Sequence, residues 1–144
     1  MVPTPGDVPL AAALHLKLAL DFRRGERRVE AHEHFRAALQ LAPDWSEAAY
    51  NWALLHVSDG TGFEALRWYR RAVAAGRGDP VPVKARQRLL SLIAEVFFAT
   101  DRAVLATRTI ELALREGGSA GVDPELEERL QAQLARYRAP AAER

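Results

Sequence analysis

The sequence predicts an all-α protein of about seven helices, and three observations support this fold class. Ala, Leu, Arg and Glu, which favour helices, are abundant in the 144 residues. Long alternations of Val, Ile or Thr with polar residues, which many strands show, are missing. A pattern of small and large apolar residues recurs three times, and such recurrence is typical of proteins built from helical repeats.

The recurring pattern is anchored on three alanines, of which the second follows the first by 12 residues and the third follows the second by seven. A bulky apolar residue precedes the first alanine, a ring stands three residues after it, and a large residue stands four after the second alanine. The three copies, written in this order, are Leu18, Ala19, Phe22, Ala31, Phe35 and Ala38; Trp52, Ala53, His56, Ala65, Tyr69 and Ala72; and Ile93, Ala94, Phe97, Ala106, Ile110 and Ala113. The copies are offset by 34 and then by 41 residues, because the stretch GRGDPVPV at 76–83 is inserted before the third.

This pattern resembles the tetratricopeptide repeat, a 34-residue helix–turn–helix unit of the form W-x2-L-G-x2-Y, A-x3-F, A and P. Further matches are His15 and Pro43 in the first copy, Ala49 in the second and Leu90 in the third, and the last two copies lack the closing proline. The resemblance covers residues 10–116 and implies a right-handed superhelix of antiparallel helix pairs, a TPR-like α-solenoid. Alanines at the helix crossings would let the backbones approach closely, and large rings would fill the space between neighbouring pairs.

We expect a lead-in at 1–9, three helix pairs at about 12–45, 46–79 and 87–118, a capping helix at 124–138 and a frayed tail at 139–144. The capping helix is indicated by a single apolar stripe and by Asp123-Pro124, an N-cap followed by proline at the first helical position. The stripe consists of Leu126, Leu130, Leu134 and Tyr137.

Local signals predict where the other helices begin and end. Asp7 is the expected N-cap of the first helix, Gly25 separates it from the second, and Pro43 ends the second. Asp44 with Glu47 is expected to cap the third helix, Thr61 to Glu64 to form a capping box for the fourth, and Thr100 or Asp101 to start the sixth.

Searches for catalytic chemistry argue against an enzyme and predict no cofactor and no metal. Cysteine is absent, so thiolate chemistry and Cys-based zinc sites are excluded, and no HExxH or phosphate-binding glycine loop occurs. His32 and His34 stand two apart on one helix and should point in different directions, which is poor spacing for a metal. His15 and His56 occupy pattern positions that face the partner helix, so all four histidines are interpreted as structural.

Charge and hydropathy further limit the class of protein. The net charge of +1 gives no overall attraction to nucleic acid or to an anionic membrane. No apolar stretch approaches the ~20 residues that span a bilayer, and the start lacks the features of a signal peptide, so we expect no membrane insertion and a cytoplasmic location. The predominance of Arg over Lys suggests a bacterial source.

Function is expected on the concave wall formed by the first helix of each pair. An exposed surface so rich in apolar side chains usually marks a contact site, so we predict a groove that binds an apolar or amphipathic segment of another protein. The chain would then be an adaptor, a scaffold or a chaperone. The predicted groove residues are Leu16, Leu20, Arg23, Glu47, Tyr50, Asn51, Leu54, Val57, Arg88, Ser91, Leu92, Glu95 and Phe98.

Two alternatives stay open. The first is a self-associating module, a homo-oligomer or a chain whose groove is filled by its own residues 2–10. The second is nucleic-acid binding through two groups of arginines, although interleaved acidic residues favour a solvated helix face with local ion pairs. The first group flanks the first turn and the second lies beside Trp68: Arg23, Arg24, Arg27 and Arg28, and Arg67, Arg70 and Arg71. A chaperone-tail clamp of the kind found in some family members is not expected, because Asn51 and Arg88 match it but Leu16, Leu20 and Leu92 do not.

Overall fold

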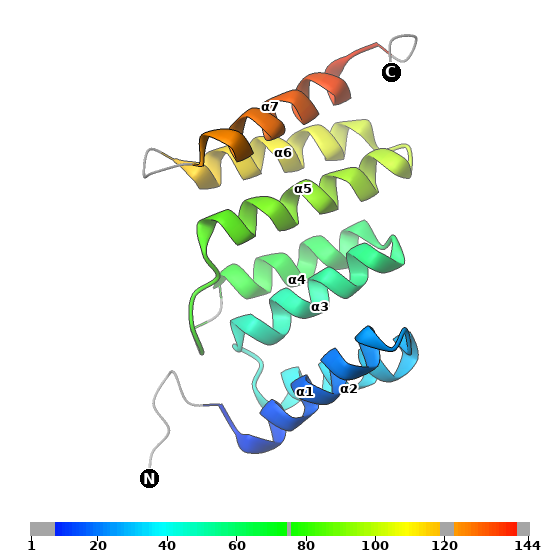
Figure 1. The fold of residues 1–144 in the computed structure, drawn as a ribbon, viewed down its shortest axis with the longest axis vertical. Coiled ribbons are helices and arrows are strands. Elements are labelled where there is room, and N and C mark those ends of the chain that lie inside the picture. The colour runs from blue at the N-terminus through cyan, green and yellow to red at the C-terminus, as the bar shows by residue number, and fades with distance from the viewer. Residues whose placement is uncertain (1–7, 75, 119–122, 141–144) are drawn as a thin grey trace. The chain divides into compact units, whose positions relative to one another are not determined.

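The computed structural model describes residues 8–74, 76–118 and 123–140, and within them it contains seven helices and no strand. The helices are α1 (Leu10–Arg24), α2 (Arg28–Leu41), α3 (Ser46–Asp59), α4 (Gly62–Ala74), α5 (Val83–Ala99), α6 (Ala103–Gly117) and α7 (Pro124–Arg138). The prediction of an all-α chain of about seven helices is confirmed. The chain folds into two compact units, 1–59 with 63–81 and 60–62 with 82–144, so the first holds α1 to α3 and nearly all of α4 and the second holds α5 to α7 (Figure 1).

The repeated alanines lie where helices of one pair cross. All nine are buried, and most have no exposed surface, including Ala19, Ala31 and Ala38 in the first unit and Ala94 and Ala106 in the second. A methyl group at the crossing lets two backbones approach, so these positions carry the packing that the sequence predicted. Leu18 departs from its pattern position because 42% of it is exposed, whereas its counterparts Trp52 and Ile93 are buried.

Aromatic residues complete the core of the first unit. Phe35 is fully buried and stacks on Trp52, whose ring centroid lies 6.3 Å away. Trp52 in turn stacks on Trp68 of α4 at 4.3 Å, so one indole links α2, α3 and α4. Large rings therefore fill the space between helix pairs, as the pattern requires.

The turns inside the three pairs share one backbone conformation. Glu26, Gly60 and Asp101 have φ values of 60°, 77° and 62°, and they are separated by the same 34 and 41 residues as the alanines. In the first and third pairs the residue after the turn residue donates its backbone N–H to the backbone carbonyl of the aromatic pattern residue. Arg27 donates to the Phe22 carbonyl and Arg102 to the Phe97 carbonyl, both at 2.8 Å. These bonds satisfy carbonyl groups at the helix ends and reverse the chain.

Several predicted helix boundaries need correction. Gly25 does end α1, but its φ is −85°, so the left-handed turn residue is Glu26. α6 begins at Ala103 with Arg102 as N-cap, because Asp101 adopts the left-handed conformation and the Thr100 hydroxyl bonds the Val96 carbonyl at the end of α5. Asp7 lies outside the described residues, and the structure assigns the N-cap of α1 to Pro9.

The start of α3 is contacted by the inserted stretch. The Asp44 carboxylate pairs with the Arg77 guanidinium at 3.1 Å, and the Ser46 hydroxyl donates to the Asp79 carbonyl at 2.7 Å. Gly78 has a φ of 81° and lies so close to Trp45 that a Cβ would stand 3.0 Å from the indole. The segment at 76–81 therefore packs against the α2–α3 turn, and Gly78 permits that approach.

In the second unit α6 contacts both α5 and α7, and Figure 1 shows the three helices side by side. Asp123 caps α7 as predicted, because its carboxylate accepts from the backbone N–H groups of Glu125 and Leu126 at 3.0 and 3.4 Å. The predicted stripe of α7 is buried throughout: Leu126, Leu130, Leu134 and Tyr137. The Asp123 carboxylate also contacts the Lys84 ammonium group of α5 at 2.6 Å, and this contact lowers the pKa of Asp123.

Candidate functional site

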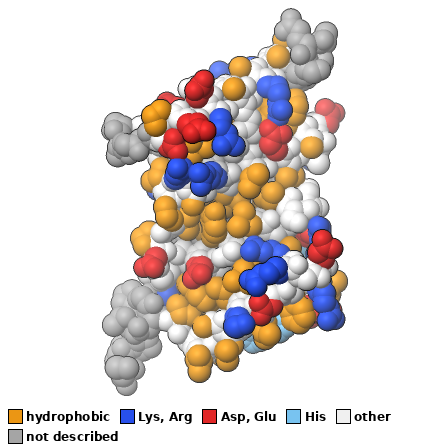
Figure 2. All heavy atoms as spheres, in the orientation of Figure 1, with side chains coloured by type: hydrophobic (Ala, Val, Ile, Leu, Met, Phe, Trp, Pro, Cys, Tyr) orange, Lys and Arg blue, Asp and Glu red, His pale blue; other side chains and the backbone are white. Residues whose placement is uncertain are grey.

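A groove of about 680 Å³ runs between α5 and α7 in the second unit. Four of the predicted groove residues line one wall: Arg88, Ser91, Leu92 and Glu95. The other wall belongs to α7 and consists of Leu126, Arg129, Leu130, Ala132, Gln133 and Arg136. In this part of the molecule Figure 2 shows charged side chains of both signs beside hydrophobic ones.

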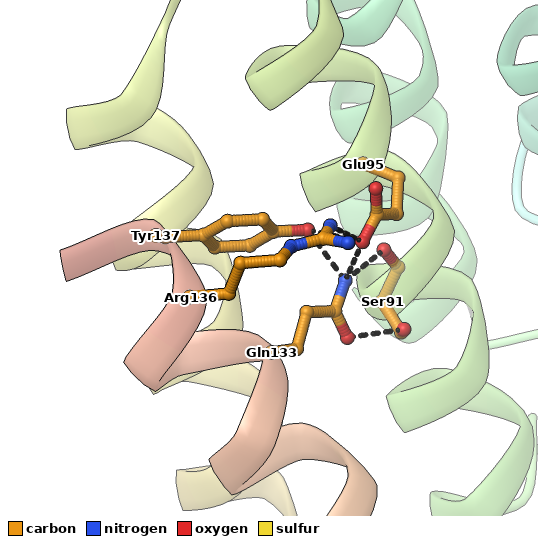
Figure 3. Close-up of polar contacts among 5 residues, drawn as sticks. All are labelled: Ser91, Glu95, Gln133, Arg136 and Tyr137. Carbon is orange, nitrogen blue, oxygen red and sulfur yellow. Dashed lines mark hydrogen bonds and ion pairs between the residues drawn. The ribbon is translucent and has the colours of Figure 1, made fainter. Parts of the chain in front are cut away.

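A polar network joins the two walls at one end of the groove (Figure 3). The Ser91 hydroxyl donates to Gln133 Oε1 at 2.7 Å, and Gln133 Nε2 lies 3.0 Å from the Ser91 carbonyl. Glu95 Oε1 accepts from Gln133 Nε2 at 3.0 Å, from the Tyr137 hydroxyl at 2.7 Å and from the Arg136 guanidinium. The carboxylate is thereby neutralised and oriented by α7.

Rings extend this network. Phe98, a predicted groove residue that does not line the hollow, stacks on Tyr137 with ring centroids 4.6 Å apart. The Arg136 guanidinium lies 5.3 Å from the centroid of each ring. Burial raises the pKa of Tyr137 to about 12, and the neighbouring Glu95 carboxylate acts in the same direction, so the phenol stays protonated and can donate its hydrogen bond.

The rest of the groove combines positive charge with one exposed apolar side chain. Arg88 and Arg129 have no ion pair with any described residue, whereas the Glu95 charge is taken up by Arg136. Leu92, which lines the same groove, is 45% exposed. The surface is therefore suited to a ligand that presents an apolar side chain flanked by acidic groups.

The predicted groove residues of the first unit lie on α1 and α3. Leu16 is only 5% exposed and belongs to the core of this unit, so its side chain packs internally and does not present a contact surface. Arg23 donates to the Asn51 carbonyl at 3.4 Å, and Asn51 donates to the Glu47 carbonyl at 2.8 Å. The other predicted residues on these helices are half-buried: Leu20, Tyr50, Leu54 and Val57.

Sequence reasoning missed the contribution of α7 to the groove. It treated residues 124–138 only as a cover for the last helix pair, because the apolar stripe accounts for one face. Arg129, Gln133 and Arg136 recur three or four residues apart and so define a second, polar face. That spacing was the available signal.

The four histidines form two separate groups, as the predicted divergence of His32 and His34 requires. His34 approaches His15 with 2.9 Å between their Nδ1 atoms, and its ring stacks on Phe22. His32 lies on the other side of α2, where its Nδ1 accepts the Trp52 indole N–H at 2.9 Å and its Nε2 contacts Asp59 at 2.6 Å. The second Asp59 oxygen pairs with Arg28 at 2.6 Å.

His32, His56 and Asp59 together have the spacing of a metal site, since one ligand atom from each lies within 4.8 Å of the others. The tautomer of His32 argues against a metal. Indole N–H can only donate, so His32 Nδ1 must carry the lone pair and Nε2 must carry the proton that faces Asp59. A protonated Nε2 cannot bind a cation, so the Trp52–His32 and His32–Asp59 contacts are interpreted as structural.

Three of the four arginines that flank the α1–α2 turn are engaged in ion pairs. Arg24 lies 3.7 Å from Asp21, Arg27 lies 2.7 Å from Glu30, and Arg28 is paired with Asp59. This part of the surface is the solvated helix face that the interleaved acids indicated. No helix among the described residues is long and apolar enough to cross a bilayer.

Comparisons with solved structures identify the fold. The N-terminal domain of stress-induced protein-1 from C. elegans is similar with a TM-score of 0.69 and 22% identity, over 85% of this chain and 94% of that chain. The type III secretion chaperone SycD of Yersinia enterocolitica, solved in complex with a peptide of the translocator YopD, is similar with a TM-score of 0.65 and 18% identity, over 87% of this chain and 90% of that chain. No family model and no curated protein matches the sequence. The chain therefore has the tetratricopeptide-type α-solenoid fold that its repeated alanines predicted.

Proposed function

We propose that this chain is a protein-interaction module without catalytic activity, which binds an amphipathic segment of another polypeptide in the groove between α5 and α7. The observation that carries the proposal is the groove between α5 and α7, in which an exposed Leu92 lies among arginines without acidic partners among the described residues. The structural similarity to SycD, which was solved with a bound peptide, supports the same use of the fold here.

The chemistry of the groove specifies the ligand further. One apolar side chain of the bound segment would contact Leu92 and Ala132, and its acidic groups would pair with Arg88 and Arg129. The Ser91–Gln133 bonds and the Glu95 network hold the two walls at a fixed separation, so little ordering is needed on binding.

Capture from a native extract, followed by peptide titration, tests the proposal. We expect Leu92→Glu to abolish retention of the bound protein, because it puts a carboxylate in place of the exposed apolar side chain of the groove. The matched control is Val29→Glu, which adds the same charge at a side chain that is 69% exposed and does not line the groove. Equal capture by the wild type and Leu92→Glu would refute the groove, provided that circular dichroism shows equal helicity.

Self-association is the competing use of the same surface. Light scattering after size exclusion, over a series of protein concentrations, distinguishes self-association from binding of another protein. A dimer that dissociates in Leu92→Glu but not in Val29→Glu would assign the groove to a second copy of this chain.

A further inference from the structure

A second hollow, of about 370 Å³, lies in the first unit between α2, α3 and α4. Its lining differs from that of the α5–α7 groove because it combines three arginines with two stacked indoles. The lining residues are His32, Arg36, Leu39, Gln40, Trp52, His56, Glu64, Arg67, Trp68 and Arg71. We refer to this hollow as the Arg–Trp cleft.

Two helices supply the polar walls of the Arg–Trp cleft. Arg36 and Gln40 stand four residues apart on α2, and Arg67 and Arg71 stand four apart on α4, so each pair occupies one helix face. The guanidinium carbons of Arg67 and Arg71 both lie 5.7 Å from the centroid of the Trp68 ring. Trp68 is itself supported by stacking on Trp52, and its indole is thus in reach of both guanidinium groups.

The positive charge of the cleft is poorly compensated. Glu64 is the single carboxylate among its lining residues, and its ion pair among the described residues is with Arg67, at 4.0 Å. Asp59 beneath the cleft is already occupied by Arg28 and His32. Arg36 and Arg71 have no acidic partner among the described residues, so three arginines face one acid.

We propose that the Arg–Trp cleft binds a phosphate-bearing small molecule. A guanidinium group presents paired N–H donors that match two oxygens of a phosphate, and arginines on opposite walls can contact it from two sides. The volume lies in the range of small-molecule sites. Nucleic acid is a poorer fit, because the arginines of the α1–α2 turn are engaged with acids and do not extend the positive surface.

Titration of the full chain with inorganic pyrophosphate tests the proposal, with calorimetry and the fluorescence of Trp68 and Trp52 as readouts. We expect one saturable site, and a Kd that increases at least about tenfold in Arg36→Gln and in Arg71→Gln, since each removes a charge-assisted contact. Arg70→Gln is the matched control, because it lies on the same helix and loses the same charge but does not line the cleft. It should change the Kd less than about twofold, as expected for general screening.

Titrations with ADP and with a Glu-rich peptide identify the kind of ligand that the cleft binds. Tighter binding of ADP than of pyrophosphate would assign a nucleotide, and equal binding would assign an inorganic anion. Absence of saturable binding, or the same loss in all three variants, would overturn the proposal. Binding of a Glu-rich peptide without binding of pyrophosphate would also overturn it and would indicate an acidic protein partner. Because the cleft lies in the first unit, these results are independent of the Leu92→Glu test.

Discussion

The attachment of α7 to α5 can be tested at one side chain, Gln133. Its amide oxygen accepts from the Ser91 hydroxyl, and its amide nitrogen lies within hydrogen-bond distance of the Ser91 carbonyl. The nitrogen is also within hydrogen-bond distance of Glu95 and Tyr137. Gln133→Leu keeps a side chain of similar length and removes every one of these hydrogen bonds. We expect this variant to be less stable while remaining helical.

The magnitude follows from the number and type of bonds lost. Oε1 accepts one hydrogen bond, and Nε2 has two N–H groups, so at most two of its three contacts are donated at once. Neutral hydrogen bonds contribute about 1 kcal/mol net and those to charged groups about 1.5–3 kcal/mol. Because Ser91, Glu95 and Gln133 are half-buried and water can replace part of the loss, we expect the free energy of unfolding to fall by about 2 kcal/mol.

Urea unfolding followed by circular dichroism measures this change. Gln131→Leu is the control, because Gln131 is exposed on the same helix and outside the network. A double-mutant cycle of Ser91→Ala with Gln133→Leu should give a coupling energy of about 1 kcal/mol. A coupling of zero, or equal losses in Gln131→Leu and Gln133→Leu, would show that the network does not hold α7.

Two further predictions concern the pH dependence of stability and the helix crossings. Burial of the His56 ring, and to a smaller extent the nearby His32, lowers the pKa of His56 below 6.5. As the pH falls, His56 is therefore protonated in the unfolded chain before it is protonated in the folded one. Its contribution to the free energy of unfolding is present above about pH 6.5 and is lost as the pH falls through the folded pKa. Urea unfolding at pH 7.5 and 5 should therefore show a smaller acid loss in His56→Gln, and an unchanged loss would contradict this assignment. Ala65 has no exposed surface, so Ala65→Trp is expected to lower the free energy of unfolding by about 1–3 kcal/mol or more in thermal unfolding. The control Ala11→Trp, at an exposed position, should be near neutral. Equal stability of Ala65→Trp and the wild type would show that Ala65 does not lie at a helix crossing.

The sequence was sufficient for features that repeat and insufficient for features that depend on contacts between distant segments. Ala19, Ala53 and Ala94 could be placed because a helix crossing admits only small side chains, and that requirement leaves a mark at each copy. Glu26 and Asp101 could not be identified as left-handed turn residues, since glycine is the usual signal and stands there only in the second copy, as Gly60. The three residues occupy equivalent positions because the three turns have the same backbone conformation, although their side chains differ.

The candidate site was only partly predictable for the same reason. Arg88, Ser91, Leu92 and Glu95 follow from the register of one helix, and the structure places them on one wall. Their partners Gln133, Arg136 and Tyr137 stand about 40 residues further along, and no local pattern pairs them with α5. Likewise, Trp52 and Asp59 fix the His32 tautomer from a different helix.

Capping and binding are compatible roles for α7, because they use different faces of one helix. Leu126, Leu130 and Leu134 repeat every four residues and are buried, which covers apolar surface of the unit. Gln133 and Arg136 project from the adjacent face and make the network with α5. A helix that served only as a cover would need no hydrogen bonds to α5. It would also not bring into the groove of Leu92 an arginine, Arg129, that has no ion pair with any described residue. The polar face of α7 is therefore the feature that links the end of the repeat to the proposed peptide groove. A variant that is less stable but keeps this polar face should still bind the peptide.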